Sequence, residues 1–279
     1  MRTARARAGA GWALLAALIG AIGGCSRSQE GTGGRLTVTG SSTLAPLVAL
    51  LAADYEREHP GVRIDVQSGG SSRGILDVRR GLADLGMVSR RLAEEEQGLH
   101  VYPIARDGVG LILNAGNPVP ALSGTQVASI YRGRIRSWGE LGGPDAPIVV
   151  VHKAEGRATR AVFLAHFGIA GHEVDADVLV GENEQAVKTV AGSPNAIGYV
   201  SISTAAIDIE HGVPIRLLGV DGIEATLESL RSGRYPIARP LNLVALEPAE
   251  GLARDFINFV LSPAAEPRFA AQRFLQVRP

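Results

Sequence analysis

The sequence is poor in several features on which common protein functions depend. It has one cysteine among 279 residues, so no disulfide can form within the chain. Aromatic residues make up 5% and the formal net charge is zero, which gives no support to a nucleic-acid-binding surface. Its histidines form no H-E-x-x-H pattern, and no G-x-x-x-x-G-K-[ST] motif is present. These absences argue against zinc-dependent and nucleotide-hydrolysing enzymes.

Long apolar runs are also absent, apart from one at the N-terminus. Three arginines precede the apolar stretch 11–23, which is too short to cross a bilayer comfortably and predicts an export signal over residues 1–24. The stretch ends in Gly-Gly-Cys and resembles the lipobox of bacterial lipoproteins, which implies lipid attachment at Cys25. An ordinary signal peptide with an incidental cysteine is the alternative. Residues 25–34 are polar and glycine-rich, so we expect a flexible tether to the membrane surface.

Strand-like and helix-like patterns alternate along the rest of the chain. The predicted strands cover residues 36–39, 62–66, 84–88, 101–114, 148–151, 196–200 and 241–246. Apolar residues at helical spacing predict a first helix over 44–58 and a last one over 249–261. This alternation predicts an α/β fold built from parallel βαβ units. Proline-containing breaks at 117–120 and 235–240 predict the connections between two parts.

Three predicted strand-to-helix loops carry small hydroxyl or glycine residues. They are Ser41-Ser42-Thr43, Gly70-Ser71-Ser72 and Gly156-Arg157-Ala158-Thr159. A helix N-terminus has unpaired N–H groups and partial positive charge, so hydroxyl groups and close backbone approach at this point suit an anion. Plain N-capping explains any one such loop equally well. Three loops together, with Ser89 and Arg90 at a strand end, favour an anion site.

Two cations flank the third loop. Lys153 and Arg157 lie at a predicted helix start, where positive charge opposes the helix dipole, so surface decoration explains them poorly. Arginine can also hold an oxyanion through two parallel hydrogen bonds. His152 could act as a base beside them, although an incidental histidine at a strand end explains it as well. Because no nucleophile–base pair or metal set is evident, we predict binding without covalent chemistry, cofactor or metal.

Six segments, in this order, resemble those of the phosphate-binding lipoproteins of bacterial phosphate ABC importers. They are TGSSTLAPL (39–47), GGSSRGI (69–75), ADLGMVSRRL (83–92), KAEGRATRAVF (153–163), NAIGYVSI (195–202) and YPIARPLNLV (235–244). The resemblance implies an α/β, two-lobed periplasmic binding protein of the type II, Venus-flytrap-like kind, with a ligand cleft between the lobes. It implies one lobe from residues 35–115 plus 240–279 and the other from residues 116–239.

The resemblance also implies which residues hold the anion. Carried over position by position, they are Ser42, Thr43, Ser71, Ser89, Arg90, Lys153, Arg157, Ala158 and Thr159. Well-known members have an aspartate where this chain has Arg90, and that carboxylate accepts the proton of phosphate, which helps to exclude sulfate. Here the selectivity stays open. Glu155 is the nearest candidate acceptor by sequence, and Asp84 either approaches the pocket or only supports its strand.

We therefore expect an extracytoplasmic, lipid-anchored and monomeric solute-binding protein that delivers inorganic phosphate to an ABC permease and binds no nucleic acid. A binding protein for another oxyanion, such as sulfate or molybdate, or a phosphate sensor is the first alternative. A phosphatase-like enzyme that uses the same anion pocket is the second.

Overall fold

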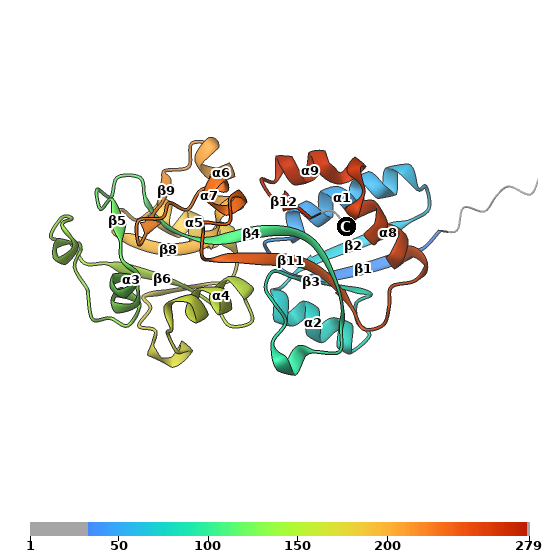
Figure 1. The fold of residues 1–279 in the computed structure, drawn as a ribbon, viewed down its shortest axis with the longest axis horizontal. Helices are drawn as coiled ribbons and strands as arrows, with labels where there is room; N and C mark the ends of the chain where they lie inside the picture. The colour runs from blue at the N-terminus through green and yellow to red at the C-terminus, as the bar shows by residue number, and fades with distance from the viewer. Residues whose placement is uncertain (1–32, 278–279) are drawn as a thin grey trace, which may run out of the picture. The chain divides into compact units, whose positions relative to one another are not determined.

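A computed structural model describes residues 33–277 of the protein. The predicted signal peptide, Cys25 and all but the last two residues of the predicted tether lie outside this range. The described residues form the α/β fold expected from the sequence, in two lobes that share one large sheet (Figure 1). None of the helices in this range has the length and apolar character that spanning a membrane requires.

Lobe 1 contains the first and the last elements of the described chain. Its strands, including two that continue into the other lobe, are β1 (Arg35–Gly40), β2 (Arg63–Ser68), β3 (Leu85–Val88), β4 (His100–Asn114), β11 (Ala238–Ala245) and β12 (Leu275–Gln276). Its helices are α1 (Ala45–Glu58), α2 (Ser71–Arg79), α8 (Gly251–Leu261) and α9 (Glu266–Ala271), with 3-10 turns η1 (Glu94–Glu96) and η4 (Pro263–Ala265).

Lobe 2 contains the elements between the two shared strands. Its strands are β5 (Ala121–Leu122), β6 (Val149–Lys153), β7 (Val178–Val180), β8 (Ala196–Ser201), β9 (Ile215–Leu217) and β10 (Gly219–Val220). Its helices are α3 (Gly124–Tyr131), α4 (Ala158–Phe167), α5 (Asn183–Ala191), α6 (Ile202–Glu210) and α7 (Leu227–Arg231), with 3-10 turns η2 (Trp138–Leu141) and η3 (Gly171–Glu173).

The large sheet has the strand order β2-β1-β3-β11-β4-β8-β6-β7, and β9 and β12 also pair with β4. β1 is parallel to β2 and β3, and β6 is parallel to β7 and β8. β11 is antiparallel to both of its neighbours, and β4 is antiparallel to β8. The predicted parallel units are therefore present in each lobe, whereas the strands that join the lobes are antiparallel. Sequence periodicity cannot show this, because it carries no information on pairing between distant strands.

Two main hydrophobic cores divide the described residues. One gathers side chains from residues 36–105 and 241–274, and the other from residues 109–237. β4 crosses from the first core to the second between Ala105 and Val109, and β11 makes the return crossing between Ile237 and Leu241. Figure 1 shows these two strands running side by side from one lobe to the other. Along β4 the side chains thus pass from the first core to the second before Val109, which is earlier in the chain than the lobe boundary predicted at residue 115.

Pro240 lies inside β11, where the sequence predicted a break. Proline has no N–H to donate, so it is tolerated in a strand only where a neighbour is missing or irregular. Pro240 pairs with Arg106 of β4, and β3 joins β11 only from Asn242 onward. The strand continues through Pro240 because no residue of β3 pairs with β11 at this position. The N–H that proline lacks would have faced β3, so its absence costs no hydrogen bond between the two strands.

Helix α1 shows how far the periodicity was informative. Leu47, Leu51 and Tyr55 are buried against the sheet, as the helical spacing predicted. Val48 and Ala52 are buried as well, whereas Leu50 is half-buried. The predicted helix and its contact with the core are therefore confirmed.

Candidate anion-binding site

Three helix N-termini meet at one small pocket. The residues that line it are Ser41, Ser42, Thr43, Gly70, Ser71, Ser89, Arg157, Ala158, Thr159, Gly181 and Asn183. They follow strands β1, β2, β3, β6 and β7 and lie at or near the starts of α1, α2, α4 and α5. The structure thus brings together all three loops that the sequence singled out.

The lobe 1 side of the pocket is built from hydroxyl groups tied to one another. Ser41 Oγ lies 2.8 Å from Ser89 Oγ, and the Ser89 N–H donates to Ser71 Oγ at 3.1 Å. The Ser41 N–H in turn donates to the carbonyl of Met87 in β3 at 2.9 Å. These bonds hold the ends of three loops at fixed separations, and Ser42 and Thr43 line the pocket beside them.

The lobe 2 side presents the first turn of α4. Arg157 is the extended N-cap residue and makes no side-chain capping bond, while Ala158 and Thr159 begin the helix and are buried. The first N–H groups of a helix have no partner within it, so they are available to a ligand. Arg157 Nη1 donates to Glu182 Oε1 at 2.6 Å, which places the guanidinium at the wall of the pocket.

The two lobes touch across the pocket through side chains of the turn before α5. Asn183 Nδ2 donates to Thr43 Oγ1 at 3.2 Å, and Ser68 Oγ donates to Glu182 Oε2 at 3.1 Å. A backbone bond from the Ser72 N–H to the Gly156 carbonyl, 3.2 Å long, links the other two loops. An anion in this pocket would therefore be contacted from both lobes at once.

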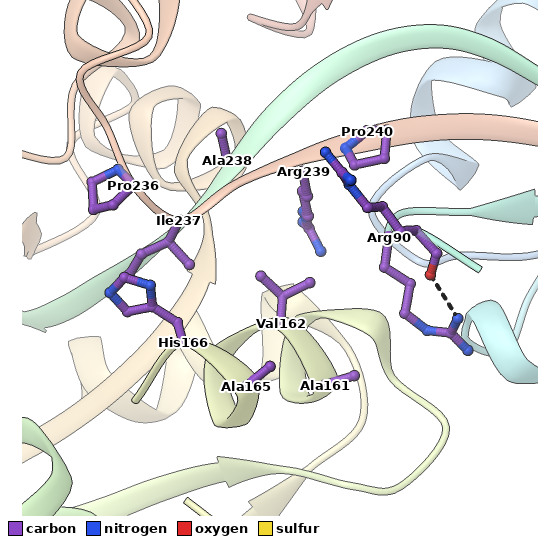
Figure 2. Close-up of a pocket in the computed structure, with 11 residues that line it drawn as sticks. Arg90, Ala161, Val162, Ala165, His166, Pro236, Ile237, Ala238, Arg239 and Pro240 are labelled. Carbon is purple, nitrogen blue, oxygen red and sulfur yellow. Dashed lines mark hydrogen bonds between the residues drawn. The ribbon is translucent and has the colours of Figure 1, made fainter. Parts of the chain in front are cut away.

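Arg90 does not line this pocket, although the sequence proposed it as a ligand. Its Nη2 donates to Glu96 Oε1 at 2.7 Å, and this hydrogen bond lowers the pKa of the Glu96 carboxyl. The side chain lines a neighbouring pocket between α4 and β11, where Figure 2 shows it opposite His166. The charge of Arg90 is thus partly neutralised by a carboxylate of its own lobe.

Lys153 is buried beside the pocket without lining it. Its Nζ donates to the main-chain carbonyl of Glu182 at 2.6 Å, so it supports the turn that carries the contacts between the lobes. Burial lowers the pKa of Lys153 to about 7, against the opposing attraction of the Glu182 carboxylate. The ammonium is therefore only partly protonated near neutral pH in the absence of an added anion.

The two carboxylates considered from the sequence lie away from the pocket. Asp84 Oδ2 accepts the Thr37 N–H at 2.7 Å, so it supports the pairing of β1 with the start of β3. The Glu155 side chain is 90% exposed and pairs with Arg160 at 3.5 Å. Among the described residues that line the pocket there is no carboxylate, and the protein offers an anion there mainly hydrogen-bond donors.

His152 has a structural environment rather than a catalytic one. Its Nδ1 lies 2.8 Å from the Tyr199 hydroxyl, and Arg160 Nε donates to its Nε2 at 3.2 Å. Burial, aided by the charge of Arg160, lowers its pKa to about 4. The imidazole is thus neutral and fully engaged at neutral pH. No group of three or more potential metal ligands occurs within residues 33–277.

Sequence reasoning missed three polar residues at or behind the pocket. Asn183 lines it, and Arg239 and Asp107 form a buried ion pair beneath it, with Arg239 Nη2 2.8 Å from Asp107 Oδ2. Charged residues are almost never fully buried without a partner. Charged residues inside two largely apolar strands, Arg106 and Asp107 in β4 and Arg239 in β11, were the signal that could have found this pair.

Comparison with known proteins agrees with this geometry. A family model described as a PBP superfamily domain matches residues 26–264. The phosphate-binding protein PstS of Bacillus subtilis is 30% identical over 242 residues, which is 85% of this chain and 78% of that protein. The structure of a putative phosphate ABC transporter substrate-binding protein with bound phosphate from Clostridium perfringens is 33% identical. It gives a TM-score of 0.81 over 88% of this chain and 100% of that one.

A second structure, an ABC-type phosphate transport receptor from Vibrio cholerae, is 27% identical. Its TM-score is 0.69, with 87% of this chain and 99% of that chain covered. The match of both the sequence and the fold extends over both lobes. The chain therefore belongs to the PBP superfamily and, within it, to the PstS family of phosphate-binding proteins, which bind a solute rather than transform it.

Proposed function

We propose that this protein captures inorganic phosphate between its two lobes outside the cytoplasm and delivers it to an ABC permease. The observation that carries the proposal is the meeting of three helix N-termini, from both lobes, at one hydroxyl-lined pocket. Such termini offer unpaired N–H groups and partial positive charge to an oxyanion. The names of the relatives, a phosphate-binding protein and a substrate-binding protein with bound phosphate, support this ligand.

Within this proposal the ligand contacts come from the residues that line the pocket. Ser42, Thr43, Ser71 and Ser89 supply hydroxyl or N–H donors from lobe 1, and Arg157, Ala158 and Thr159 supply them from lobe 2. Lys153 and Arg90 do not line the pocket, and they attract the anion only through their positive charge. Charge-assisted hydrogen bonds of this kind are about twice as strong as neutral ones.

The proposal extends to the predicted anchor and partners. The chain would be exported, lipid-modified at Cys25 and held at a membrane surface as a monomer, with the ABC permease as its partner. The family to which it belongs and the separate lobes of the fold support extracytoplasmic solute binding. Mass spectrometry of the exported protein tests the anchor, since a diacylated or triacylated N-terminal cysteine is expected at residue 25.

A second candidate ligand is sulfate. It is favoured by the absence of a carboxylate among the described residues that line the pocket. A carboxylate near the anion rejects a fully ionised oxyanion by repulsion and accepts a proton from a protonated one. Without it, repulsion of sulfate is lost.

Isothermal titration calorimetry decides between these ligands. The exported protein, purified in mild detergent, is titrated with phosphate and then with sulfate at pH 6 and pH 8. Phosphate binding that is much tighter than sulfate binding supports the proposal. Equal binding of both ions indicates a general oxyanion-binding protein, and binding of neither ion contradicts both candidates.

A further inference from the structure

Arg239 lies where the two lobes meet. It belongs to β11, directly opposite Asp107 of β4 in the antiparallel register, and these are the two strands that cross between the lobes. Both side chains are fully buried. Figure 2 shows the Arg239 side chain leaving β11 on the side of α4. Burying two charges carries a desolvation penalty, so the pair calls for an explanation beyond packing.

All of the N–H donors of the Arg239 guanidinium have partners. Nε and one Nη2 hydrogen reach Asp107 Oδ2, at 3.2 and 2.8 Å. The others reach hydroxyl oxygens of the pocket. These are Thr43 Oγ1 at 3.1 Å from Nη2, Thr159 Oγ1 at 3.0 Å from Nη1 and Ser89 Oγ at 3.5 Å from Nη1. One guanidinium therefore contacts hydroxyl groups of both lobes.

These bonds determine what each hydroxyl can still do. A hydroxyl oxygen accepts up to two hydrogen bonds and donates one. Thr43 Oγ1 accepts from both Arg239 and Asn183, and Ser89 Oγ accepts from Arg239 and lies 2.8 Å from Ser41 Oγ. Both acceptor sites of Thr43 Oγ1 and Ser89 Oγ are thus occupied, and one on Thr159 Oγ1, which leaves the O–H hydrogens to point into the pocket that these residues line.

We propose that Arg239 is a positioning residue that turns the hydroxyl hydrogens of Thr43, Ser89 and Thr159 toward the bound anion. Asp107 neutralises the guanidinium and fixes its plane, and is itself held by Ser203 Oγ at 3.0 Å. The pocket then consists of donors from both lobes, which favours the most deprotonated form of an oxyanion. This inference rests on the proposed function, because it assigns a role in the same site.

The main test uses the double variant Arg239→Gln/Asp107→Asn, which removes both charges together and leaves no unpaired buried ion. Arg106→Gln is the matched control, since Arg106 is an exposed arginine on the same strand next to Asp107. Phosphate and sulfate affinities are measured by calorimetry at pH 6 and pH 8. We expect the double variant to lose about 10- to 100-fold in affinity for both ions, and the control to bind as the wild type does.

Two further readouts separate positioning from a structural role. The double variant should bind phosphate relatively better than sulfate at pH 6, because its freed hydroxyls can accept the proton of the anion. In addition, Thr159→Val should weaken binding strongly in the wild type and only slightly in the double variant, whereas Thr159→Ser should be mild in both. Non-additivity of this kind is expected for residues that act through one another.

Arg239→Lys keeps the charge and the pairing with Asp107 but lacks the planar set of donors, so it provides a second variant if the double variant does not fold. We expect it to lose affinity and to show the same non-additivity with Thr159→Val. Wild-type affinities in the folded Arg239 variants, or an equal effect of Thr159→Val in every background, would overturn the inference alone. A wild-type protein that binds neither ion would overturn the proposed function as well.

Discussion

In lobe 1 the pocket is lined by serine and threonine hydroxyls that are bonded to one another, whereas in lobe 2 it is flanked by Lys153, Arg157 and Glu182. The hydroxyl groups of lobe 1 are fixed by short bonds among three loops. The charges of lobe 2 are paired with each other and with the turn before α5. We infer that lobe 1 contributes mainly geometry and lobe 2 mainly charge, and that the two can be altered separately.

The two lobes also differ in how much room the backbone leaves beside the glycines of the pocket loops. Gly40 ends β1 with a φ of +130°, and a Cβ there would lie 2.4 Å from the Met87 carbonyl oxygen. Gly156 precedes α4 with a φ of +77°, but the nearest atom to its Cβ would be the Ser72 Cβ at 3.7 Å. The lobe 1 loop therefore has no room for a side chain, and the lobe 2 loop has some.

The largest expected effect is on the stability of lobe 1. Gly40→Ala combines a positive φ with a backbone clash, so we expect the free energy of unfolding to fall by about 2–4 kcal/mol. Gly156→Ala meets only the backbone strain and should cost about 1 kcal/mol. Urea unfolding followed by circular dichroism measures both. Equal losses in the two variants would contradict the contrast between the loops.

The next effect concerns the charge that lobe 2 supplies. Arg157→Ala removes a cation from the pocket wall and should weaken phosphate binding by about 1.5–3 kcal/mol. Arg90→Ala should change affinity by less than about 1 kcal/mol, because Arg90 is paired with Glu96 outside the pocket. The sequence proposed both arginines as ligands of the anion, so calorimetry of the two variants tests that prediction against the structure. Arg157→Ala alone leaves the Glu182 carboxylate without its arginine partner, and that negative charge could itself repel the anion. The double variant Arg157→Ala/Glu182→Gln removes this charge and serves as the control.

The smallest expected effect is a fraction of a proton taken up on binding. Lys153 has a pKa of about 7, so at pH 8 it is mostly neutral in the free protein. An anion bound nearby favours the ammonium form and raises this pKa, so binding takes up protons and the Lys153 contribution to affinity falls as the pH rises through 7 to 8. Calorimetry in two buffers with different ionisation enthalpies measures the uptake.

The matched variant for this prediction is Lys153→Met, which keeps a long side chain in the buried site. Protons released or bound by phosphate itself are the same in both proteins, so the difference between wild type and variant isolates the lysine. An identical proton uptake in the two proteins would show that Lys153 does not sense the anion.

The local features of this protein could be read from its sequence. The strand–loop–helix pattern and the small residues at each helix start predicted the loops at Ser42, Ser71 and Thr159, because capping and helix periodicity depend on neighbours within a few residues. The same logic predicted an α/β fold. It could not show that β4 and β11 run antiparallel between the lobes, since pairing of distant strands leaves no local pattern.

The direction of long side chains was decided by tertiary structure alone. Arg90 turns to Glu96 and Lys153 to the Glu182 carbonyl, although Arg90 directly follows the pocket residue Ser89 and Lys153 precedes the third loop. Arg239 reaches Thr43 and Thr159, residues far from it in sequence, because β11 passes between the lobes at that point. The sequence by itself predicted an anion site and the three loops that line the candidate pocket. Only the folded chain decided which cations serve it, because a buried charge lies where distant partners can neutralise it.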